Sequence, residues 1–333
     1  MKFTKLLLPI LLVLTVIVAG CSKESSQPME TEKQMETIRM ASWSKPIVEQ
    51  SNLYVAEEKG FFEKENLTFE YIPGAGGGDA VKNILAGNAD IAFANLEAVL
   101  LAAEKGEKLK IIYNIYPENV FNLVSLKESN IQSIEDLKGK NVGVYSLASG
   151  TYQNLQVLLH DAGVKEEEIT VTATGVLNFA PLMEGQVAAT AATDTGLYDA
   201  KQKGLGEVNI VEVKDVLNTP SDVFVVTEKV FNEKKELLIR FLQAYKDSIE
   251  YTMENPDEAA DIATKHAVDG TDVTRNKEII AIRNQTSKNN KGLGMFDFTV
   301  LKEVEASYVE MGLLQKTVNI EDLTTNELVE QLK

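Results

Sequence analysis

The 333-residue chain has few of the residues on which several classes of protein depend. It contains one cysteine, one tryptophan and two histidines, so the sequence offers neither a disulfide framework nor a cluster of cysteine and histidine ligands for a metal. Basic residues are also scarce, because 33 lysines and arginines stand against 50 acidic residues and give a net charge of −17. A nucleic-acid-binding surface requires a basic face, so this balance argues against that function.

The remaining composition is that of a folded protein. Hydrophobic residues make up 44% of the chain and charged residues 25%, which excludes a disordered tail and a fibrous repeat. A length above 300 residues favours two domains over one. The composition therefore predicts an acidic globular protein with two hydrophobic cores.

The N-terminus has the pattern of an export signal. Lys2 and Lys5 precede an apolar run over residues 6–19, which is shorter than the roughly 20 residues that a membrane-spanning helix needs. The run ends at Ala19-Gly20-Cys21, which resembles the lipobox of bacterial lipoproteins. We therefore expect a signal peptide over residues 1–20 and a lipid on Cys21 that anchors the protein to the extracytoplasmic face of a membrane. A buried, unmodified cysteine is the alternative.

The chain after Cys21 divides into a tether and two lobes. Residues 21–37 are polar and lack periodicity, which predicts a flexible tether. From Ile38, short apolar strands alternate with helical patterns, and the rhythm restarts after Glu118. Beyond Asp222, long amphipathic helices replace the alternation. We expect residues 38–120 and 222–333 to form the first lobe and residues 121–221 the second, with two crossings as a hinge.

A weak internal repeat supports two related lobes. Leu85-Ala86-Gly87 precedes a predicted strand that ends at Asn95, and Met183-Glu184-Gly185 precedes a predicted strand that ends at Asp194. Ligands of parallel sheets bind at the carboxyl ends of the strands. Both end residues are therefore expected to face a cleft between the lobes.

The order of these features resembles a known family of solute-binding proteins. The matching stretches are Trp43-x-x-Pro46, LYVAEEKGFFEKENLTFEY (53–71), GGGDAVKNILAGNADIAFAN (76–95), SIEDLKGKNVGV (133–144), SGTYQNLQVLL (149–159) and PLMEGQVAATAATD (181–194). Together they resemble the ABC-importer proteins that bind sulfonates, nitrate or thiamine-pyrimidine precursors. The resemblance implies an α/β, two-lobed periplasmic-binding-protein fold of type II, with parallel-sheet lobes, a two-stranded hinge and a ligand enclosed by hinge closure.

Trp43 is the first candidate ligand-binding residue. It follows the first predicted strand, and pyrimidine-binding members of the family have an aromatic residue here, which implies a flat ring stacked on the indole. A tryptophan of the core is the alternative. The chain is one residue longer than its relatives between Trp43 and Tyr54, so the resemblance extends to Gln50 and Ser51 without fixing their register.

Two glycine-bearing loops and several polar residues complete the candidate site. Gly76 and Gly77, like Ser149-Gly150-Thr151, stand at predicted helix starts, where backbone N–H groups bind a ligand oxygen. Asp194 would accept a hydrogen bond from a ligand amine and would repel an anion. Ordinary turns and helix caps are the alternatives. The remaining polar candidates are Asn95, Asn178 and Tyr198.

The sequence predicts a binding protein without a cofactor or metal, and not an enzyme. A pyrimidine synthase shares the implied fold and uses an active-site histidine, but His160 and His266 both fall in ordinary helical patterns. A thiamine-pyrimidine precursor is the first ligand hypothesis and a sulfonate such as taurine the second; nitrate remains open because of Lys45. The implied partners of the monomer are a permease with its cytoplasmic ATPase, and a sensor kinase is the alternative partner.

Overall fold

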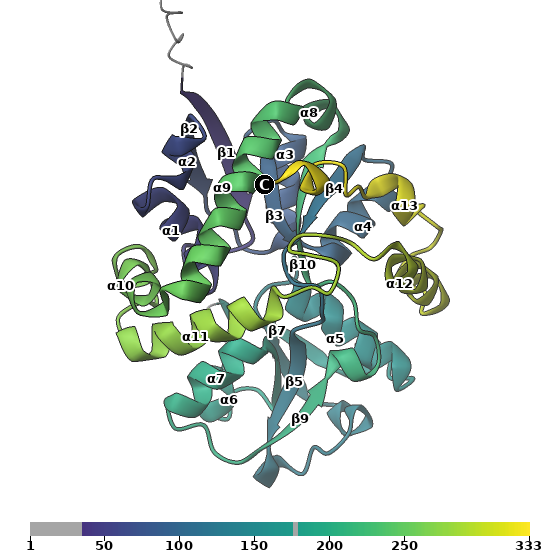
Figure 1. The fold of residues 1–333 in the computed structure, drawn as a ribbon. Coiled ribbons are helices and arrows are strands. Elements are labelled where there is room, and N and C mark those ends of the chain that lie inside the picture. Colours follow the sequence, from purple (N-terminus) through teal and green to yellow (C-terminus); the bar gives the residue numbers. More distant parts are fainter. Residues whose placement is uncertain (1–34, 176–178) are drawn as a thin grey trace, which may run out of the picture. The chain divides into compact units, whose positions relative to one another are not determined.

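The computed structural model describes residues 35–175 and 179–333 and contains two α/β lobes, each built on a five-stranded sheet (Figure 1). Cys21, Asn178 and most of the predicted tether lie outside these residues. No helix within the two described stretches is both long enough and apolar enough to cross a membrane.

The first sheet has the strand order β2-β1-β3-β10-β4. Its strands are β1 (Glu36–Ser42), β2 (Leu67–Ile72), β3 (Ile91–Asn95), β4 (Leu109–Asn114) and β10 (Asp222–Thr227). Strands β1, β2 and β3 are parallel, whereas β10 is antiparallel to both β3 and β4 and pairs Asp222 with Asn95. The sheet is therefore mixed rather than parallel.

The second sheet repeats this arrangement with the order β7-β6-β8-β5-β9. Its strands are β5 (Phe121–Leu126), β6 (Asn141–Val144), β7 (Thr170–Ala173), β8 (Ala189–Thr193) and β9 (Val208–Glu212). Here β5 is antiparallel to β8 and β9 and pairs Phe121 with Thr193. In each sheet, the antiparallel strand is the one that follows a crossing from the other lobe. This order confirms the predicted two-lobed periplasmic-binding-protein fold.

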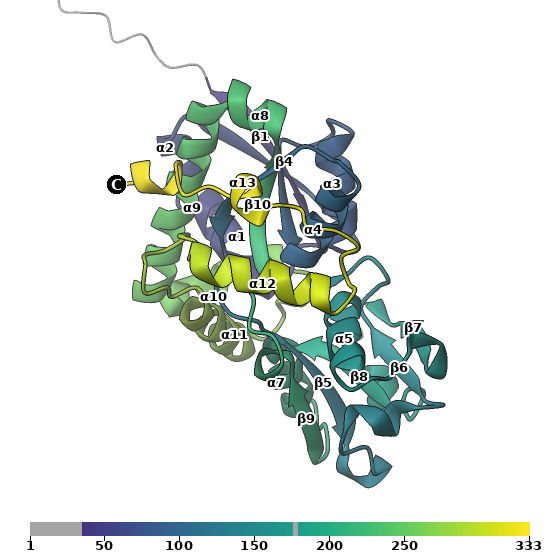
Figure 2. The ribbon, with the colours of Figure 1, turned by 90° about the vertical axis from the view of Figure 1, so that its right-hand side faces the viewer.

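Helices surround both sheets, and α5 and α7 pack on the second (Figure 2). The α-helices are α1 (Ser51–Glu58), α2 (Phe61–Lys64), α3 (Gly77–Leu85), α4 (Leu96–Glu104), α5 (Gly150–Asp161), α6 (Ala180–Met183), α7 (Asp194–Gln202), α8 (Glu228–Glu233), α9 (Lys235–Glu254), α10 (Pro256–His266), α11 (Val273–Thr286), α12 (Phe298–Glu310) and α13 (Ile320–Leu323). The 3₁₀ helices are η1 (Val48–Gln50), η2 (Lys127–Ser129), η3 (Ile134–Leu137), η4 (Glu166–Glu168), η6 (Val213–Asp215) and η7 (Val329–Gln331).

Local sequence explains where these helices begin and which face they bury. Thr193 caps α7 by accepting a hydrogen bond from the Gly196 N–H at 3.3 Å, which satisfies a free donor of the first turn. On α9, the apolar positions Leu238, Phe241 and Leu242 follow the helical period and are fully buried. The amphipathic pattern of α9 thus covers the first sheet.

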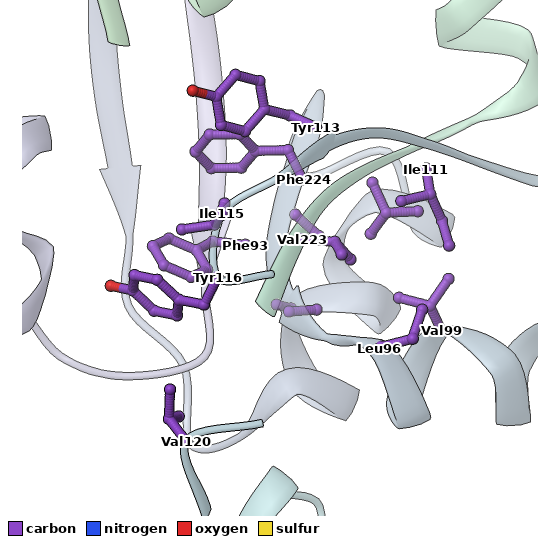
Figure 3. Close-up of a cluster of buried hydrophobic side chains, with 14 of the residues drawn as sticks. Phe93, Leu96, Val99, Ile111, Tyr113, Ile115, Tyr116, Val120, Val223 and Phe224 are labelled. Atoms are coloured by element: carbon purple, nitrogen blue, oxygen red, sulfur yellow. The ribbon is translucent and has the colours of Figure 1, made fainter. Parts of the chain in front are cut away.

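Aromatic side chains form the centre of the first lobe (Figure 3). Phe224 on β10 is fully buried, and its ring lies 5.4 Å from that of Phe93, 5.2 Å from that of Phe241 and 4.9 Å from that of Tyr245. The main hydrophobic cluster continues from this lobe into the second, whereas a smaller cluster lies in the second lobe alone. The two predicted cores are therefore joined, because the lobes are in contact.

The packing around Phe224 predicts a large cost for its truncation. Phe224→Ala should lower the free energy of unfolding by about 3–5 kcal/mol, because the lost ring leaves a cavity among rigid neighbours. Urea denaturation would measure the change, with Phe61→Ala on the partly exposed α2 as the matched control. Similar losses for the two variants would contradict the central position of Phe224.

Candidate functional site

A cavity of about 40 Å³ lies between the two lobes. The first lobe lines it with Trp43, Glu49, Gly76, Gly77, Asn95 and Asp222, and the second with Phe121, Tyr145, Ser149, Gly150, Thr151 and Thr193. The cavity lies at the carboxyl ends of β1, β3, β6 and β8, where α/β sheets bind ligands. A volume of this size holds about two or three water molecules, so a ring-shaped ligand requires the lobes to separate further.

Aromatic side chains form one wall of the cavity. Trp43 lies edge-on to Tyr145, with the ring centroids 6.1 Å apart, and also edge-on to Phe93 at 6.4 Å. The indole Nε1 is buried and has no hydrogen-bond partner among the described residues. Phe121 and Tyr145 were not predicted from the sequence, although each stands at a strand end facing the cleft. The indole and these two rings provide flat apolar surface for a ligand.

The two glycine-bearing loops meet the cavity from opposite lobes. Gly77 begins α3, and a Cβ atom there would lie 2.1 Å from the Asn95 Oδ1 atom. Gly150 begins α5, and a Cβ atom there would lie 2.5 Å from the Phe121 ring. Neither position therefore has room for a side chain. The N-termini of both helices consequently approach the cavity closely, and their partial positive charge favours a ligand oxygen there.

Backbone and hydroxyl groups of these loops also connect the lobes. The Gly78 N–H donates to the Ala148 carbonyl at 3.1 Å, and the Ser146 hydroxyl donates to the Ala75 carbonyl at 2.6 Å. Ser149 stands at the N-cap position of α5, but its side chain makes no capping hydrogen bond. Its hydroxyl accepts a hydrogen bond from the Ser146 N–H at 3.1 Å and lies 2.8 Å from that of Thr151. The loops of the two lobes are thus in direct contact across the cleft.

Asn95 belongs to a buried polar network behind the cavity. Its Nδ2 donates to Glu97 Oε2 at 2.7 Å and to Gln153 Oε1 at 2.6 Å, whereas its Oδ1 has no hydrogen-bond partner in the described chain. Glu97 also accepts from Asn154 Nδ2 at 2.9 Å and from the Tyr308 hydroxyl at 2.8 Å. Burial raises the pKa of Glu97, opposed by these hydrogen bonds. The network ties β3 and α4 to α5 and α12.

Asp222 is the least expected residue of the cavity wall. It begins β10, is 6% exposed, and its carboxyl group receives no hydrogen bond from any described residue. Burial raises the pKa of Asp222 to about 8, and Glu49 adds to the rise while Arg283 opposes it. The sequence analysis missed this residue because it considered the carboxyl ends of strands, whereas the antiparallel β10 places its first residue at that edge.

The predicted acceptor Asp194 is not part of the cavity wall. It begins α7, where its Oδ1 accepts a hydrogen bond from the Thr195 N–H at 2.7 Å and pairs with Arg283 Nη2 at 2.7 Å. The buried Arg283 guanidinium thus pairs with this carboxylate in the structure, and the role of Asp194 as a ligand acceptor stays a prediction.

The other predicted residues divide between the wall and its surroundings. Trp43, Gly76, Gly77, Asn95, Ser149, Gly150 and Thr151 line the cavity, and their role in binding a ligand stays a prediction. Gln50 lies behind it and donates to the Ser42 hydroxyl at 2.8 Å, and the Ser51 hydroxyl donates to the Val48 carbonyl. Tyr198 is partly buried on α7, outside the wall, and Asn178 lies outside the described residues.

Helix α11 lies next to α7 of the second lobe (Figure 1), and Arg283 on α11 contacts acidic residues of both lobes. The residue is 2% exposed, and its Nη2 lies 2.7 Å from Asp194 and 2.8 Å from the Thr195 hydroxyl of the second lobe. On the first-lobe side, Nη2 lies 3.0 Å from Glu49 Oε2, and the guanidinium carbon lies 5.0 Å from the centre of the Tyr116 ring. Nη1 has no partner in the described structure. We name this arrangement of Arg283, Glu49 and Asp194 the Arg283 latch.

A sequence profile described as "NMT1/THI5 like" matches residues 48–259, which is more than half of the chain. The chain belongs to the NMT1/THI5-like family.

Curated relatives of this NMT1/THI5-like chain carry names of two kinds. The riboflavin-binding protein RibY of Chloroflexus aurantiacus is 25% identical over 99% of this chain and 98% of its own length. The formylaminopyrimidine-binding protein of Halalkalibacterium halodurans is 24% identical over 76% of each chain. A 4-amino-5-hydroxymethyl-2-methylpyrimidine phosphate synthase of Legionella pneumophila is 22% identical over 70% of this chain and 74% of its own length.

A solved structure shows the same fold. The alkanesulfonate-binding protein SsuA from Xanthomonas axonopodis pv. citri, bound to MOPS, superposes with a TM-score of 0.69 at 15% identity and covers 88% of this chain and 99% of its own. The NMT1/THI5-like chain thus has the fold of this binding protein.

The histidines of the chain lie away from the cavity. His160 is exposed at the end of α5, and His266 stacks on Tyr54 at 5.4 Å with its Nε2 2.8 Å from Glu58. Neither residue lines the cavity wall. Within residues 35–175 and 179–333, no group of three or more histidine, cysteine or acidic residues is arranged to hold a metal.

The Arg283 latch predicts a stability loss when its cation is removed. Arg283→Met leaves Glu49 without its partner, and the free energy of unfolding should fall by about 3 kcal/mol because an uncompensated charge then lies in a poorly solvated position. Lys277→Met on the same helix is the matched control, since its partner Asp257 is 82% exposed and the loss should stay below about 1 kcal/mol. Equal losses in urea denaturation would contradict the latch.

The raised pKa of Asp222 predicts that Asp222→Asn increases the stability of the protein, by an amount that depends on pH. Because the folded state holds the proton of Asp222 more tightly than the unfolded state, the wild-type chain loses stability as the pH rises from about 4 to about 8. Asp222→Asn should therefore become progressively more stable than the wild type over this range, with a constant difference above pH 8. Urea denaturation at pH 5, 7 and 9 measures this difference in the free energy of unfolding, and Asp215→Asn at an exposed position serves as the control. A difference between Asp222→Asn and the wild type that does not change with pH would contradict the prediction.

Proposed function

We propose that the chain is the extracytoplasmic solute-binding component of an ABC importer and captures a small heteroaromatic molecule of the thiamine-pyrimidine-precursor type. The observation that carries this proposal is the cavity between the lobes, in which Trp43, Tyr145 and Phe121 surround polar groups of both lobes. Ligand sites of this kind combine apolar rings with a few convergent polar atoms. The names of the riboflavin- and formylaminopyrimidine-binding relatives support the same class.

Hinge closure supplies the mechanism. The chain crosses between the sheets twice, once before β5 and once before β10, so the lobes can separate about two connecting segments. The ligand enters the open cleft and then contributes contacts to both lobes. Because it stabilises only the closed arrangement, it shifts the population toward the form that a permease would recognise.

The charges around the cavity favour a heteroaromatic ligand over an anion. Two acidic residues, Glu49 and Asp222, lie in the wall, and among the described wall residues there is no lysine or arginine. Arg283 is close, but Glu49 and Asp194 already pair with it, and Lys45 is exposed outside the wall. Two helix N-termini still favour a sulfonate, which is the second candidate ligand. Riboflavin is a larger heteroaromatic alternative that requires more separation of the lobes than a single ring does.

The remaining parts of the proposal concern anchoring, partners and catalysis. A lipid on Cys21 would hold the monomer at the extracytoplasmic face, where it delivers its ligand to a permease with a cytoplasmic ATPase. A sensor kinase is the alternative partner. Although a synthase is among the relatives, binding is favoured over catalysis because no histidine is found among the described residues of the cavity wall.

A thermal-shift screen of the purified chain tests the proposal. A ligand at 100 times its dissociation constant adds about 2.7 kcal/mol of stability. We expect such a shift from aminopyrimidines, thiamine fragments or riboflavin, and its loss in Trp43→Ala, since the ring then has no indole to contact. Phe61→Ala, an aromatic substitution outside the cavity, serves as the control.

The other outcomes of this screen are equally informative. A shift produced only by alkanesulfonates, taurine or nitrate would overturn the heteroaromatic assignment and keep the solute-binding role. Silence across the whole panel would contradict the proposed function.

A further inference from the structure

We propose that Asp222 selects the ligand by binding an edge of a heteroaromatic ring on which a hydrogen-bond donor stands beside an acceptor. Such an edge is a ring nitrogen next to an amino group, as in an aminopyrimidine, or a ring N–H next to a carbonyl, as in a flavin. This inference rests on the proposed function and names the side chain and the ligand atoms within it.

The backbone of the first sheet holds Asp222 in place. Asp222 on β10 pairs with Asn95 on β3. The backbone carbonyl of Asp222 accepts hydrogen bonds from the N–H groups of Ile115 at 3.0 Å and Tyr116 at 3.3 Å. The backbone is therefore fixed on both sides while the side chain belongs to the cavity wall. The pairing of β10 in the sheet thus fixes the direction in which the side chain of residue 222 leaves the backbone.

The carboxyl group of Asp222 has no protein partner among the described residues, although the residue is only 6% exposed. A residue that is 6% exposed normally satisfies its polar atoms, because leaving them unpaired costs free energy. Within the part of the chain that the structure describes, no hydrogen bond or ion pair reaches this carboxyl group, whereas Glu49 and Asp194 beside it are both paired with Arg283. A group kept unpaired in the wall of a closed cleft is available to a ligand.

The groups facing Asp222 determine its charge. Glu49 on η1 and Glu97 on α4 disfavour a further negative charge, and Arg283 on α11 opposes them. Tyr116 and Tyr245 also interact electrostatically with Asp222, and both remain neutral because burial raises their pKa values. Burial is the largest influence on Asp222 itself, and a pKa of about 8 keeps its carboxyl group neutral at pH 7.

A neutral carboxyl group has one O–H donor and one carbonyl acceptor side by side. It therefore forms two parallel hydrogen bonds with a ring edge that presents one acceptor and one donor. A sulfonate or nitrate presents acceptors only and would place a negative charge beside Glu49. The same geometry thus accepts a neutral heterocycle and disfavours an anion.

Two other unpaired atoms extend this recognition. Trp43 Nε1 is a donor and Asn95 Oδ1 an acceptor, and neither has a hydrogen-bond partner among the residues described. Both residues share the cavity wall with Asp222, and Asn95 is its neighbour in the sheet. The first lobe alone therefore holds two unpaired hydrogen-bonding atoms besides the carboxyl group, and both are buried in this structure.

Calorimetric titration with matched ligand pairs tests the role of Asp222. The first pair is 4-amino-2-methylpyrimidine and its 4-dimethylamino analogue, and the second is riboflavin and 3-methylriboflavin; in each pair, methylation removes the donor of the edge. We expect the methylated member to bind the wild-type chain at least about tenfold more weakly, as expected for a buried polar group left unpaired. The pair that shows this difference identifies which ring the chain takes.

Three variants connect this difference to the carboxyl group. Asp222→Asn keeps one donor and one acceptor and should retain the difference, whereas Asp222→Leu and the smaller Asp222→Ala should abolish it. Asp247→Asn on α9 is the matched control outside the cavity and should leave the difference unchanged. Between pH 8 and pH 9.5, the affinity of the wild-type chain should decrease by up to about tenfold for each pH unit, because the Asp222 carboxyl group loses its proton. The affinity of Asp222→Asn should stay constant over this range.

The outcomes separate this inference from the proposed function. Equal binding of the methylated and unmethylated rings, or an unchanged difference in Asp222→Leu and Asp222→Ala, would overturn the role of Asp222 and leave the heteroaromatic ligand standing. Binding of ethanesulfonate alone, or of no ligand in the set, would overturn the proposed ligand class and this inference with it.

Discussion

Arg283 contributes to neither sheet, yet its guanidinium group contacts an acidic side chain from each lobe. The contact with Glu49 fixes η1 against the cavity, and the contact with Asp194 fixes the start of α7. By pairing with these two carboxylates, Arg283 leaves Asp222 as the unpaired acid of the cavity wall. The electrostatic character of the cleft therefore depends on a residue from the C-terminal helices.

The sequence predicts the fold and one half of the cavity well, for physical reasons. Strand and helix periodicity reflects local burial, and the glycines at 76, 77 and 150 stand where no side chain fits. By contrast, Asp222 becomes a wall residue only because β10 enters the sheet antiparallel, and Asp194 leaves the wall because Arg283, 89 positions later, pairs with it. Strand direction and long-range ion pairs have no local signature in one sequence, so this half required the structure.

The fold alone does not identify the ligand, and the residues of the cavity wall explain why. Relatives with this architecture carry names that refer to riboflavin, formylaminopyrimidine and alkanesulfonates. The glycine loops and helix starts provide backbone N–H groups, which favour a ligand oxygen without selecting the rest of the molecule. Discrimination must therefore come from the few side chains that face the cavity, chiefly Trp43, Asn95 and Asp222.

The insertion of β10 between β3 and β4 has a consequence for how the chain folds. The second sheet is contiguous in sequence, so residues 121–212 contain all the strands it needs. The first sheet lacks β10, the strand between β3 and β4, until residue 222 is available, more than a hundred residues after β4. Such distant pairings form slowly because of the entropy of loop closure. The second lobe along the chain can thus fold first, and the sheet of the first lobe is completed afterwards, when β10 inserts between β3 and β4.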